Sequence, residues 1–264
     1  MTQLPPLRDG ERLDEVNEQI RLIQKTKGLT FGTDAFLLAA YIRPSARTVA
    51  VELGGGTGIV SLLLAAKEKV KEVTAIEIQH DFADLIERNA ALNGLSDRVK
   101  ALCADVRTVS PLSFGREVDL VLSNPPYMKV GAGKRNEAEE KYIARHEVCG
   151  GIDDFCAVAG RLLRHGGKFV CVWRPDRMSE LFSALHAARL EPKRMTMVHA
   201  DANAEPCALL LEAIKGGSPS MRITPPLLLY KPAVEKGARE LTPEAQKIYD
   251  ECSFPNENSI RGKQ

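Results

Sequence analysis

Short β-rich runs alternate with helical runs from residue 48 onward, and this alternation restricts the possible folds more than any other feature. Strands are predicted at 48–53, 72–78, 99–105, 118–123, 168–173, 193–199 and 206–214. Helices are predicted at 59–67, 81–94, 178–190 and 152–163, the last of which is expected to end at His165-Gly166-Gly167. Such alternation implies an α/β protein with a Rossmann-like, seven-stranded sheet covered by helices on both faces.

The predicted sheet also indicates where a ligand would bind. Ligands of open α/β sheets bind beyond the carboxyl ends of the strands. The loops that follow Leu53, Ile78, Cys103 and Ser123 are therefore expected to meet in one crevice.

Two shorter segments flank the predicted core, so we divide the chain into residues 1–47, 48–214 and 215–264. The first is an N-terminal arm, in which RLIQKTKGLTFGT predicts a hairpin that turns at Lys27-Gly28, followed by a helix from Asp34 to Tyr41. The third is rich in Gly, Pro, Ser and charge. Its TPPLLLYKP run is expected to add one strand, and its last residues are expected to be mobile.

Composition excludes several classes of protein. No apolar run is long enough to span a membrane, and the N-terminal MTQLPPLRDGERLDE has no apolar core of a signal peptide, so we expect a cytoplasmic protein. Six cysteines are scattered without a C-x-x-C pair, which predicts buried thiols and neither a metal site nor disulfides. The net charge is only +1, so any nucleic-acid footprint must be local. The oligomeric state stays open between a monomer and a homodimer.

A glycine-rich loop, ELGGGTG at 52–58, follows the first core strand and opens a helix. Glycines there let the backbone approach a ligand closely. The dinucleotide fingerprint fails because Ile59 stands where a small residue is required, and no G-x-x-x-x-G-K-[ST] phosphate loop is present. The Glu52 carboxylate lies just before the turn. It would contribute little to the binding of a phosphate but much to the binding of a cationic ligand.

Two further carboxylates follow the next strands. Glu77 can accept hydrogen bonds from both hydroxyls of a ribose, and Asp105 can accept one from an adenine amino group. With these residues the chain resembles the class I S-adenosyl-L-methionine-dependent methyltransferases over roughly residues 48–213. The resemblance implies that the cofactor is bound by Glu52, Gly54, Gly56, Gly58, Glu77, Ile78, Asp105, Val106 and Asn124.

The fourth core strand ends in Asn124-Pro125-Pro126-Tyr127. Two prolines cannot continue a central strand, because they lack an N–H and fix their own φ. In the resembling family this form is associated with methylation of planar nitrogens, either adenine N6 or a glutamine amide. The Asn124 side-chain oxygen and the Pro125 carbonyl would accept hydrogen bonds from the amine, and Tyr127 would stack on its plane. These three residues are the predicted catalytic set.

The rest of the chain resembles the tRNA(Val) N6-adenine methyltransferase family, which modifies the purine just 3′ of the anticodon, position 37. QKTKGLTFGTDAFLLAAYI and YIARHE at 142–147 carry this resemblance. It implies an RNA partner, no membrane and no metal. The loop 130–141 is Gly-rich and charged, as expected of a lid. The acceptor would be bound by Phe31, Thr33, Asp34, Pro126, Lys129, Arg145 and His146.

Two alternatives remain at this point. Protein glutamine methyltransferases of the release-factor type share the NPPY motif, although they carry a sizeable helical domain ahead of the cofactor loop. A non-catalytic module that kept the fold is the other alternative, and the presence of Glu52, Glu77, Asp105 and Asn124 argues against it.

Local basic clusters could supply an RNA footprint. Their members are Arg8, Arg12, Arg21, Lys25 and Lys27 in the arm, Lys129, Lys134, Arg135, Lys141 and Arg145 near the motif, and Arg161, Arg164, Lys168, Arg174 and Arg177 further on. A solvated surface explains such clusters about equally well.

Overall fold

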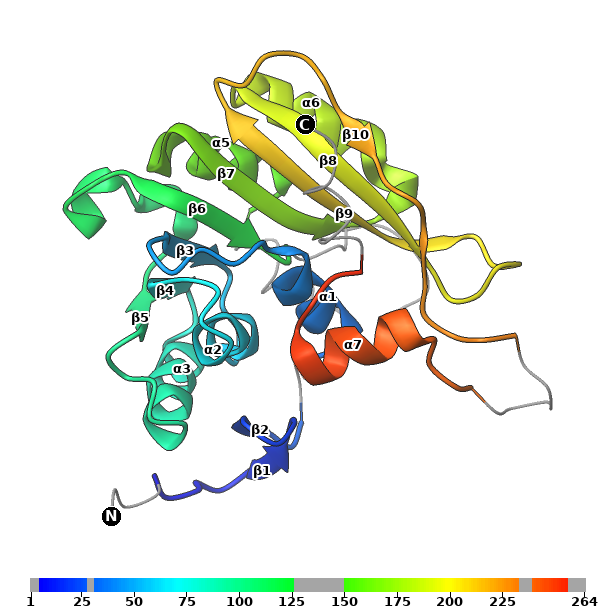
Figure 1. Cartoon of the computed structure of the whole chain (residues 1–264). Helices are drawn as coiled ribbons and strands as arrows, with labels where there is room; N and C mark the ends of the chain where they lie inside the picture. The colour runs from blue at the N-terminus through cyan, green and yellow to red at the C-terminus, as the bar shows by residue number, and fades with distance from the viewer. Residues whose placement is uncertain (1–4, 28–30, 126–149, 233–238, 256–264) are drawn as a thin grey trace, which may run out of the picture.

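The computed structural model describes residues 5–27, 31–125, 150–232 and 239–255. Its main sheet has the strand order β10-β8-β9-β7-β6-β3-β4-β5, and β11 pairs with β8 (Figure 1). The seven long strands are β3 (Val49–Leu53), β4 (Glu72–Glu77), β5 (Val99–Cys103), β6 (Val118–Ser123), β7 (Leu163–Trp173), β8 (Leu190–His199) and β9 (Pro206–Lys215). They match the seven predicted strands. Two short strands, β10 (Arg222–Ile223) and β11 (Leu227–Leu228), extend the sheet beyond them.

Helices cover both faces of this sheet, as predicted. One face packs against α1 (Thr33–Tyr41), α2 (Ile59–Ala66), α3 (His80–Leu92) and α7 (Pro243–Glu251). The other face packs against α5 (Ile152–Leu162) and α6 (Met178–Ala187), as Figure 1 also shows. Short 3₁₀ turns lie at Val106–Thr108, Pro111–Phe114 and Pro175–Arg177.

The side chains of β7 show how the two layers of core arise. Val170 and Val172 are buried against the α1 side, whereas Phe169, Cys171 and Trp173 are buried against the α5 side. Successive side chains of a strand point to opposite faces, so a continuous apolar run is required where both faces are covered. The run KFVCVW meets this requirement.

The N-terminal arm forms a hairpin over residues 11–25, whereas the prediction was a hairpin over residues 21–33 that turns at Lys27-Gly28. β1 (Glu11–Glu15) pairs antiparallel with β2 (Arg21–Lys25), so β2 is the second strand of the hairpin and not the first. Asn17 makes the turn, because its side-chain oxygen accepts the N–H groups of Gln19 and Ile20. Asparagine forms such local turns readily. Gly28 of the predicted turn lies outside the described residues.

The start of β7 also differs from the prediction. The strand begins at Leu163, directly after α5, and not at Lys168. Between the pairs Val118↔Leu163 and Leu120↔Lys168, β6 advances two residues while β7 advances five. The predicted helix terminator His165-Gly166-Gly167 is therefore part of a bulge inside the strand.

Two further features were not predicted. Residues 243–251 form α7, which packs against α1, although only one strand was expected in the C-terminal segment.

The described cysteines are all free. Cys156, Cys171 and Cys252 are buried as predicted, but Cys103 and Cys207 are exposed. Cys103 is the last residue of β5, and Cys207 is the second residue of β9.

Candidate active site

The carboxyl ends of four parallel strands meet side by side. Leu53 at the end of β3 pairs with both Ile76 of β4 and Ser123 of β6, and Glu77 pairs with Cys103 of β5. The Ser123 hydroxyl also donates a hydrogen bond to the Leu53 carbonyl, at 2.8 Å. This register confirms that the loops after these strands share one edge of the sheet.

The glycine loop between β3 and α2 is held against the end of β4. The N–H groups of Gly54 and Gly55 both donate to the Ile76 carbonyl, at 2.9 and 3.0 Å. Gly56 has φ 54°, a left-handed conformation that favours glycine. Gly55 has no room for a larger side chain, since an added Cβ would lie 2.8 Å from the Ala75 Cβ. The loop therefore needs glycine both for its turns and for its close approach to the sheet.

Glu77 fastens this loop to the start of α3. Its carboxylate accepts one hydrogen bond from the Gly56 N–H at 3.0 Å and another from the Gln79 N–H at 2.9 Å. A carboxylate has about four acceptor positions, so each oxygen retains one lone pair for a further donor. The residue is buried apart from about 6% of its surface. This arrangement fits a pair of ribose hydroxyls.

Glu52 lies underneath the loop and faces the start of α2. Its carboxylate accepts a hydrogen bond from the Ser61 N–H at 3.2 Å and a short one from the Ser61 hydroxyl. Burial raises the pKa of Glu52 to about 8, the Ser61 hydrogen bonds act against this rise, and the nearby charge of Glu77 adds to it. Glu52 is therefore a protonated, buried acid at neutral pH unless a cation lies beside it.

Asp105, after β5, is engaged by its neighbour Arg107. The Arg107 guanidinium donates to both carboxylate oxygens, and the Arg107 N–H donates to one of them. These hydrogen bonds lower the pKa of Asp105, although its partial burial opposes them. An adenine amino group would have to share this carboxylate with Arg107. Val106 beside it is buried, and Ile78 after Glu77 is half-buried.

Asn124 and Pro125 directly follow β6, next to the glycine loop. Asn124 is half-buried and Pro125 is buried. Because Ser123 pairs with Leu53, Asn124 and Gly54 come from neighbouring strand ends. The other predicted residues of this region, Pro126, Tyr127, Lys129, Arg145 and His146, lie outside the described residues, as does the predicted lid.

A cavity of about 550 Å³ lies at the same edge of the sheet. It is lined by Asp34 from the start of α1, by Trp173 and Arg174 at the end of β7, and by Glu205 and Cys207 at the start of β9. Asp34 is thus placed where an acceptor could enter. The other two predicted residues of this segment, Thr33 at the start of α1 and Phe31 just before it, have internal contacts. The Thr33 hydroxyl accepts a hydrogen bond from the Tyr249 hydroxyl, and the Phe31 ring packs against Phe36.

The described basic residues do not form one footprint. In the arm, Arg8 pairs with Asp84, Arg12 with Asp14 and Lys25 with Asp81. The cluster from Arg161 to Arg177 is divided between the two edges of the sheet: Lys168 and Arg174 are separated by roughly 20 Å of strand.

Asn89 of α3 is a site residue that the sequence did not indicate by any motif. Its amide nitrogen donates to the carbonyls of Ile23 and Thr57, and its oxygen accepts the Ile23 N–H at 2.7 Å. It is fully buried and so joins the hairpin to the glycine loop. The sequence nevertheless held one indication of its role, because Asn89 is a polar residue on the apolar face of a predicted amphipathic helix.

Comparison with known proteins identifies the family. The family model described as "Methyltransferase small domain" matches residues 26–189. The chain belongs to this family. It is therefore an S-adenosyl-L-methionine-dependent methyltransferase, as the strand-end residues had led us to expect.

Several curated relatives carry the same name. A protein of Porphyromonas gingivalis (strain ATCC BAA-308 / W83) named tRNA1(Val) (adenine(37)-N6)-methyltransferase is 28% identical over 74% of this chain and 78% of its own length. One of that name from a Flavobacteriaceae bacterium (strain 3519-10) is 30% identical over 69% of this chain and 75% of its own length.

Solved structures share the fold with different acceptors. A predicted O-methyltransferase from Agrobacterium tumefaciens has a TM-score of 0.65 at 24% identity, covering 84% of this chain and 97% of that chain. A geranyl diphosphate C-methyltransferase from Streptomyces coelicolor, solved with S-adenosyl-L-homocysteine, has a TM-score of 0.51 at 13% identity, covering 69% and 78%. The fold is thus confirmed, but it does not select the acceptor, which must be argued from the site.

Two kinds of feature are absent from the described residues. No helix there is long and apolar enough to cross a membrane. Nor do three or more His, Cys, Asp or Glu side chains gather there in a way that could hold a metal ion.

Proposed function

We propose that this methyltransferase transfers the methyl group of S-adenosyl-L-methionine to N6 of an adenine in tRNA, the purine at position 37. The observation that carries the proposal is the position of Asn124-Pro125 at the end of β6, beside the glycine loop that follows β3. The names of the curated relatives agree with it.

The chemistry of the acceptor explains why Asn124 and Pro125 would be needed. The lone pair of an adenine amine is delocalised into the ring, so this nitrogen is a poor nucleophile. Two acceptors aimed at its N–H bonds favour the pyramidal, nucleophilic form, and such preorganised partners act mainly in the transition state. We assign these roles to the Asn124 side-chain oxygen and the Pro125 carbonyl, with Tyr127 as the stacking surface.

The cofactor would lie along the strand ends. We assign the ribose hydroxyls to Glu77, the methionine part to the loop of Gly54, Gly56 and Gly58 with Glu52 beneath it, and the adenine to the region of Asp105, Val106 and Ile78. The bound cofactor supplies an electrophilic methyl group on a positively charged sulfur. The protein then has to place the amine in line, at about 3–3.5 Å.

The entry for the acceptor base is the cavity lined by Asp34, Trp173 and Cys207. A base in a folded tRNA must be turned out of its stack to reach such a site, which costs a few kcal/mol and less for an unpaired loop base. A carboxylate such as Asp34 can accept a hydrogen bond from the exocyclic amino group of adenine, whereas it would repel a phosphate.

The test offers the enzyme radiolabelled cofactor with an unmodified tRNA(Val) transcript, with the same transcript carrying guanine at position 37, and with a release factor. Label recovered as N6-methyladenosine from the first RNA alone is the expected result. Label in a glutamine of the release factor would instead support the alternative acceptor. Asn124→Ala is the matched variant, and it should lose turnover with every acceptor while still binding the cofactor.

A further inference from the structure

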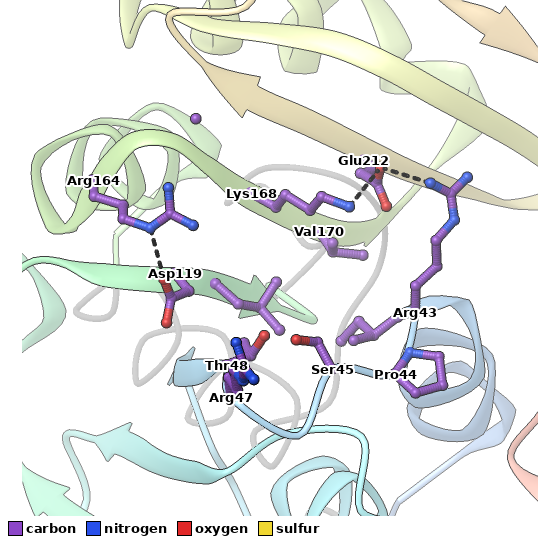
Figure 2. A pocket seen from close by; sticks show the side chains of 13 residues that line it. Arg43, Pro44, Ser45, Arg47, Thr48, Asp119, Arg164, Lys168, Val170 and Glu212 are labelled. Atoms are coloured by element: carbon purple, nitrogen blue, oxygen red, sulfur yellow. Dashed lines mark hydrogen bonds and ion pairs between the residues drawn. The ribbon is translucent and has the colours of Figure 1, made fainter.

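A second cavity, of about 440 Å³, lies at the opposite edge of the sheet, where the strands begin (Figure 2). One wall is the connection from α1 to β3, with Arg43, Ser45 and Arg47. The other wall is formed by the first residues of β6 and β7 and the last part of β9, with Arg164, Lys168 and Glu212. Because β3 is five residues long, this cavity is roughly 15 Å from the cofactor loop. All of its lining residues are among those that the structure describes.

The bulge in β7 shapes this cavity. The extra residues between Leu163 and Lys168 contain Arg164, whose guanidinium reaches Asp119 of β6 and lines the cavity. Bulges commonly re-aim a side chain near a functional site. The inserted residues thus add a cation to the cavity wall and contribute no pairing to the sheet.

The lining carries an excess of positive charge. Its four cations, Arg43, Arg47, Arg164 and Lys168, face only two carboxylates, Asp119 and Glu212. Both carboxylates also have other partners. The Val49 N–H donates to Asp119 at 2.9 Å, and the buried Arg194, which is not part of the lining, donates to Glu212 at 3.2 Å.

The cations keep unused hydrogen-bond donors. Lys168 and Arg43 lie 3.5 and 3.8 Å from Glu212, which is ion-pair distance, yet neither side chain makes a hydrogen bond to any residue that the structure describes. The Arg47 side chain has no ion pair or hydrogen bond within the described ranges. Arg164 uses Nε for Asp119 and Nη1 for the His165 carbonyl, which leaves Nη2. Figure 2 shows Arg164, Lys168 and Arg43 around the rim of one hollow.

We propose that this cavity binds a phosphate group, and that the phosphate belongs to the backbone of the RNA acceptor. Several N–H donors on cations, in a pocket with net positive charge, are the groups that recognise phosphate oxygens. The side chains of Arg43, Arg164 and Lys168 are 40%, 54% and 38% exposed, so a ligand can reach them. The assignment to RNA rests on the proposed function, whereas the affinity for phosphate follows from the cavity alone.

A site on this edge would complement the catalytic edge. The arm cations Arg8, Arg12 and Lys25 are each already paired with a carboxylate. Contacts to phosphates fix the position of a nucleic acid without reading its sequence. A tRNA held at both edges of the sheet would be oriented before its base enters the catalytic site.

The first test compares wild type with the double variant Arg43→Gln, Lys168→Gln. Binding of inorganic phosphate is measured by calorimetry, and binding of tRNA(Val) transcript is measured at several salt concentrations. We expect the variant to lose phosphate binding and to bind tRNA about tenfold more weakly. Its log–log salt dependence should be shallower by about 0.7–0.9, the value for one lost phosphate contact. Cofactor affinity should not change and serves as the check on folding.

Matched variants separate this site from a general loss of charge. Lys231→Gln with Arg239→Gln also removes two surface cations and should leave phosphate binding intact. Ser45→Glu places a carboxylate in the cavity without breaking any ion pair and should abolish binding, whereas Ser45→Gln of the same size should not.

The outcomes distinguish the two sources of phosphate. Loss of phosphate binding together with weaker tRNA binding supports the proposal. Loss of phosphate binding with unchanged tRNA binding would overturn RNA as the source and leave a small phosphorylated ligand. Unchanged phosphate binding in both the double variant and Ser45→Glu would overturn the site itself. None of these binding measurements requires adenine to be the methyl acceptor, so failure of the proposed function would appear separately, in the labelling assay.

Discussion

Replacing Glu52 with glutamine should make the protein more stable at neutral pH, and the gain should grow as the pH rises. Burial raises the pKa of Glu52 from its ordinary 4.5 to about 8. Below pH 4.5 both the folded and the unfolded states hold the proton, so the residue costs nothing. Between 4.5 and 8 only the unfolded chain loses it, so the free energy of unfolding falls by about 1.4 kcal/mol per pH unit. Glutamine keeps an acceptor for Ser61 and does not ionise.

The difference in unfolding free energy between Glu52→Gln and wild type should therefore increase by about 3 kcal/mol from pH 5 to pH 7.5. Urea unfolding, followed by circular dichroism across this range, measures it. Glu72→Gln removes a carboxylate from the exposed pair with Arg116 and controls for the change in net charge. A difference that stays constant with pH would show that Glu52 is already ionised in the folded protein, and the burial argument would fail.

The same residue links cofactor binding to protons. The cofactor carries positive charge on its sulfur and its amino group, so its binding beside Glu52 should favour the ionised carboxylate. Calorimetry at pH 7 in buffers of different ionisation enthalpy should then detect a proton released by wild type and none released by Glu52→Gln. Equal values for the two proteins would place the methionine part of the cofactor away from Glu52.

Four further substitutions test the site and its supports. Glu77→Ala should weaken binding of the cofactor in calorimetry, since two charge-assisted hydrogen bonds of about 1.5–3 kcal/mol each are lost; an unchanged affinity would contradict the ribose assignment. Asn124→Ala should reduce the methylation rate by about 10²–10³ while cofactor affinity stays nearly the same, and near-normal turnover would refute its role. Asn89→Ala should lower the unfolding free energy by about 2–4 kcal/mol, because buried groups of Ile23 and Thr57 lose their partner; a smaller loss in urea unfolding would mean that water replaces the amide. Lys69→Met should cost about 2–3 kcal/mol in the same assay, because the buried ammonium binds the carbonyls of Ala39, Ala40 and Cys252, and a neutral result would show that these carbonyls find other donors.

The sequence predicted the parts of the molecule that depend on local patterns. The seven long strands and the residues at their ends, such as Glu77 and Asn124, follow from apolar runs that stop at polar or glycine residues. Strand ends of a parallel sheet share one edge, and the pairing of the strands confirms that these residues lie together there. The family comparison then confirmed the cofactor.

The features that were missed depend on contacts distant in sequence. His165-Gly166-Gly167 has the composition of a turn, and only the pairing of Leu163 and Lys168 with β6 makes it a bulge inside a strand. Lys69 has the composition of a surface residue, yet it is buried where α1 ends and meets the C-terminal segment. A lysine near a helix C-terminus binds its free carbonyls, but the partner helix cannot be found from the lysine's own neighbours.

The hairpin shows how a basic segment can serve the site without touching the acceptor. Arg8 pairs with Asp84, and Lys25 pairs with Asp81. In a third pair the arm supplies the carboxylate: Arg88 of α3 lies 2.7 Å from Glu11, and both side chains are almost buried. All three pairs join the arm to α3, and Asn89 adds hydrogen bonds from α3 to both β2 and the glycine loop. The helix begins at His80, three residues after Glu77, whose carboxylate accepts the Gln79 N–H. Restraining α3 therefore restrains the carboxylate assigned to the ribose. Arg8, Glu11 and Lys25 of the arm are thus used within the fold, whereas the side chains of Arg43, Arg47 and Lys168 at the opposite edge of the sheet make no hydrogen bond to a described residue.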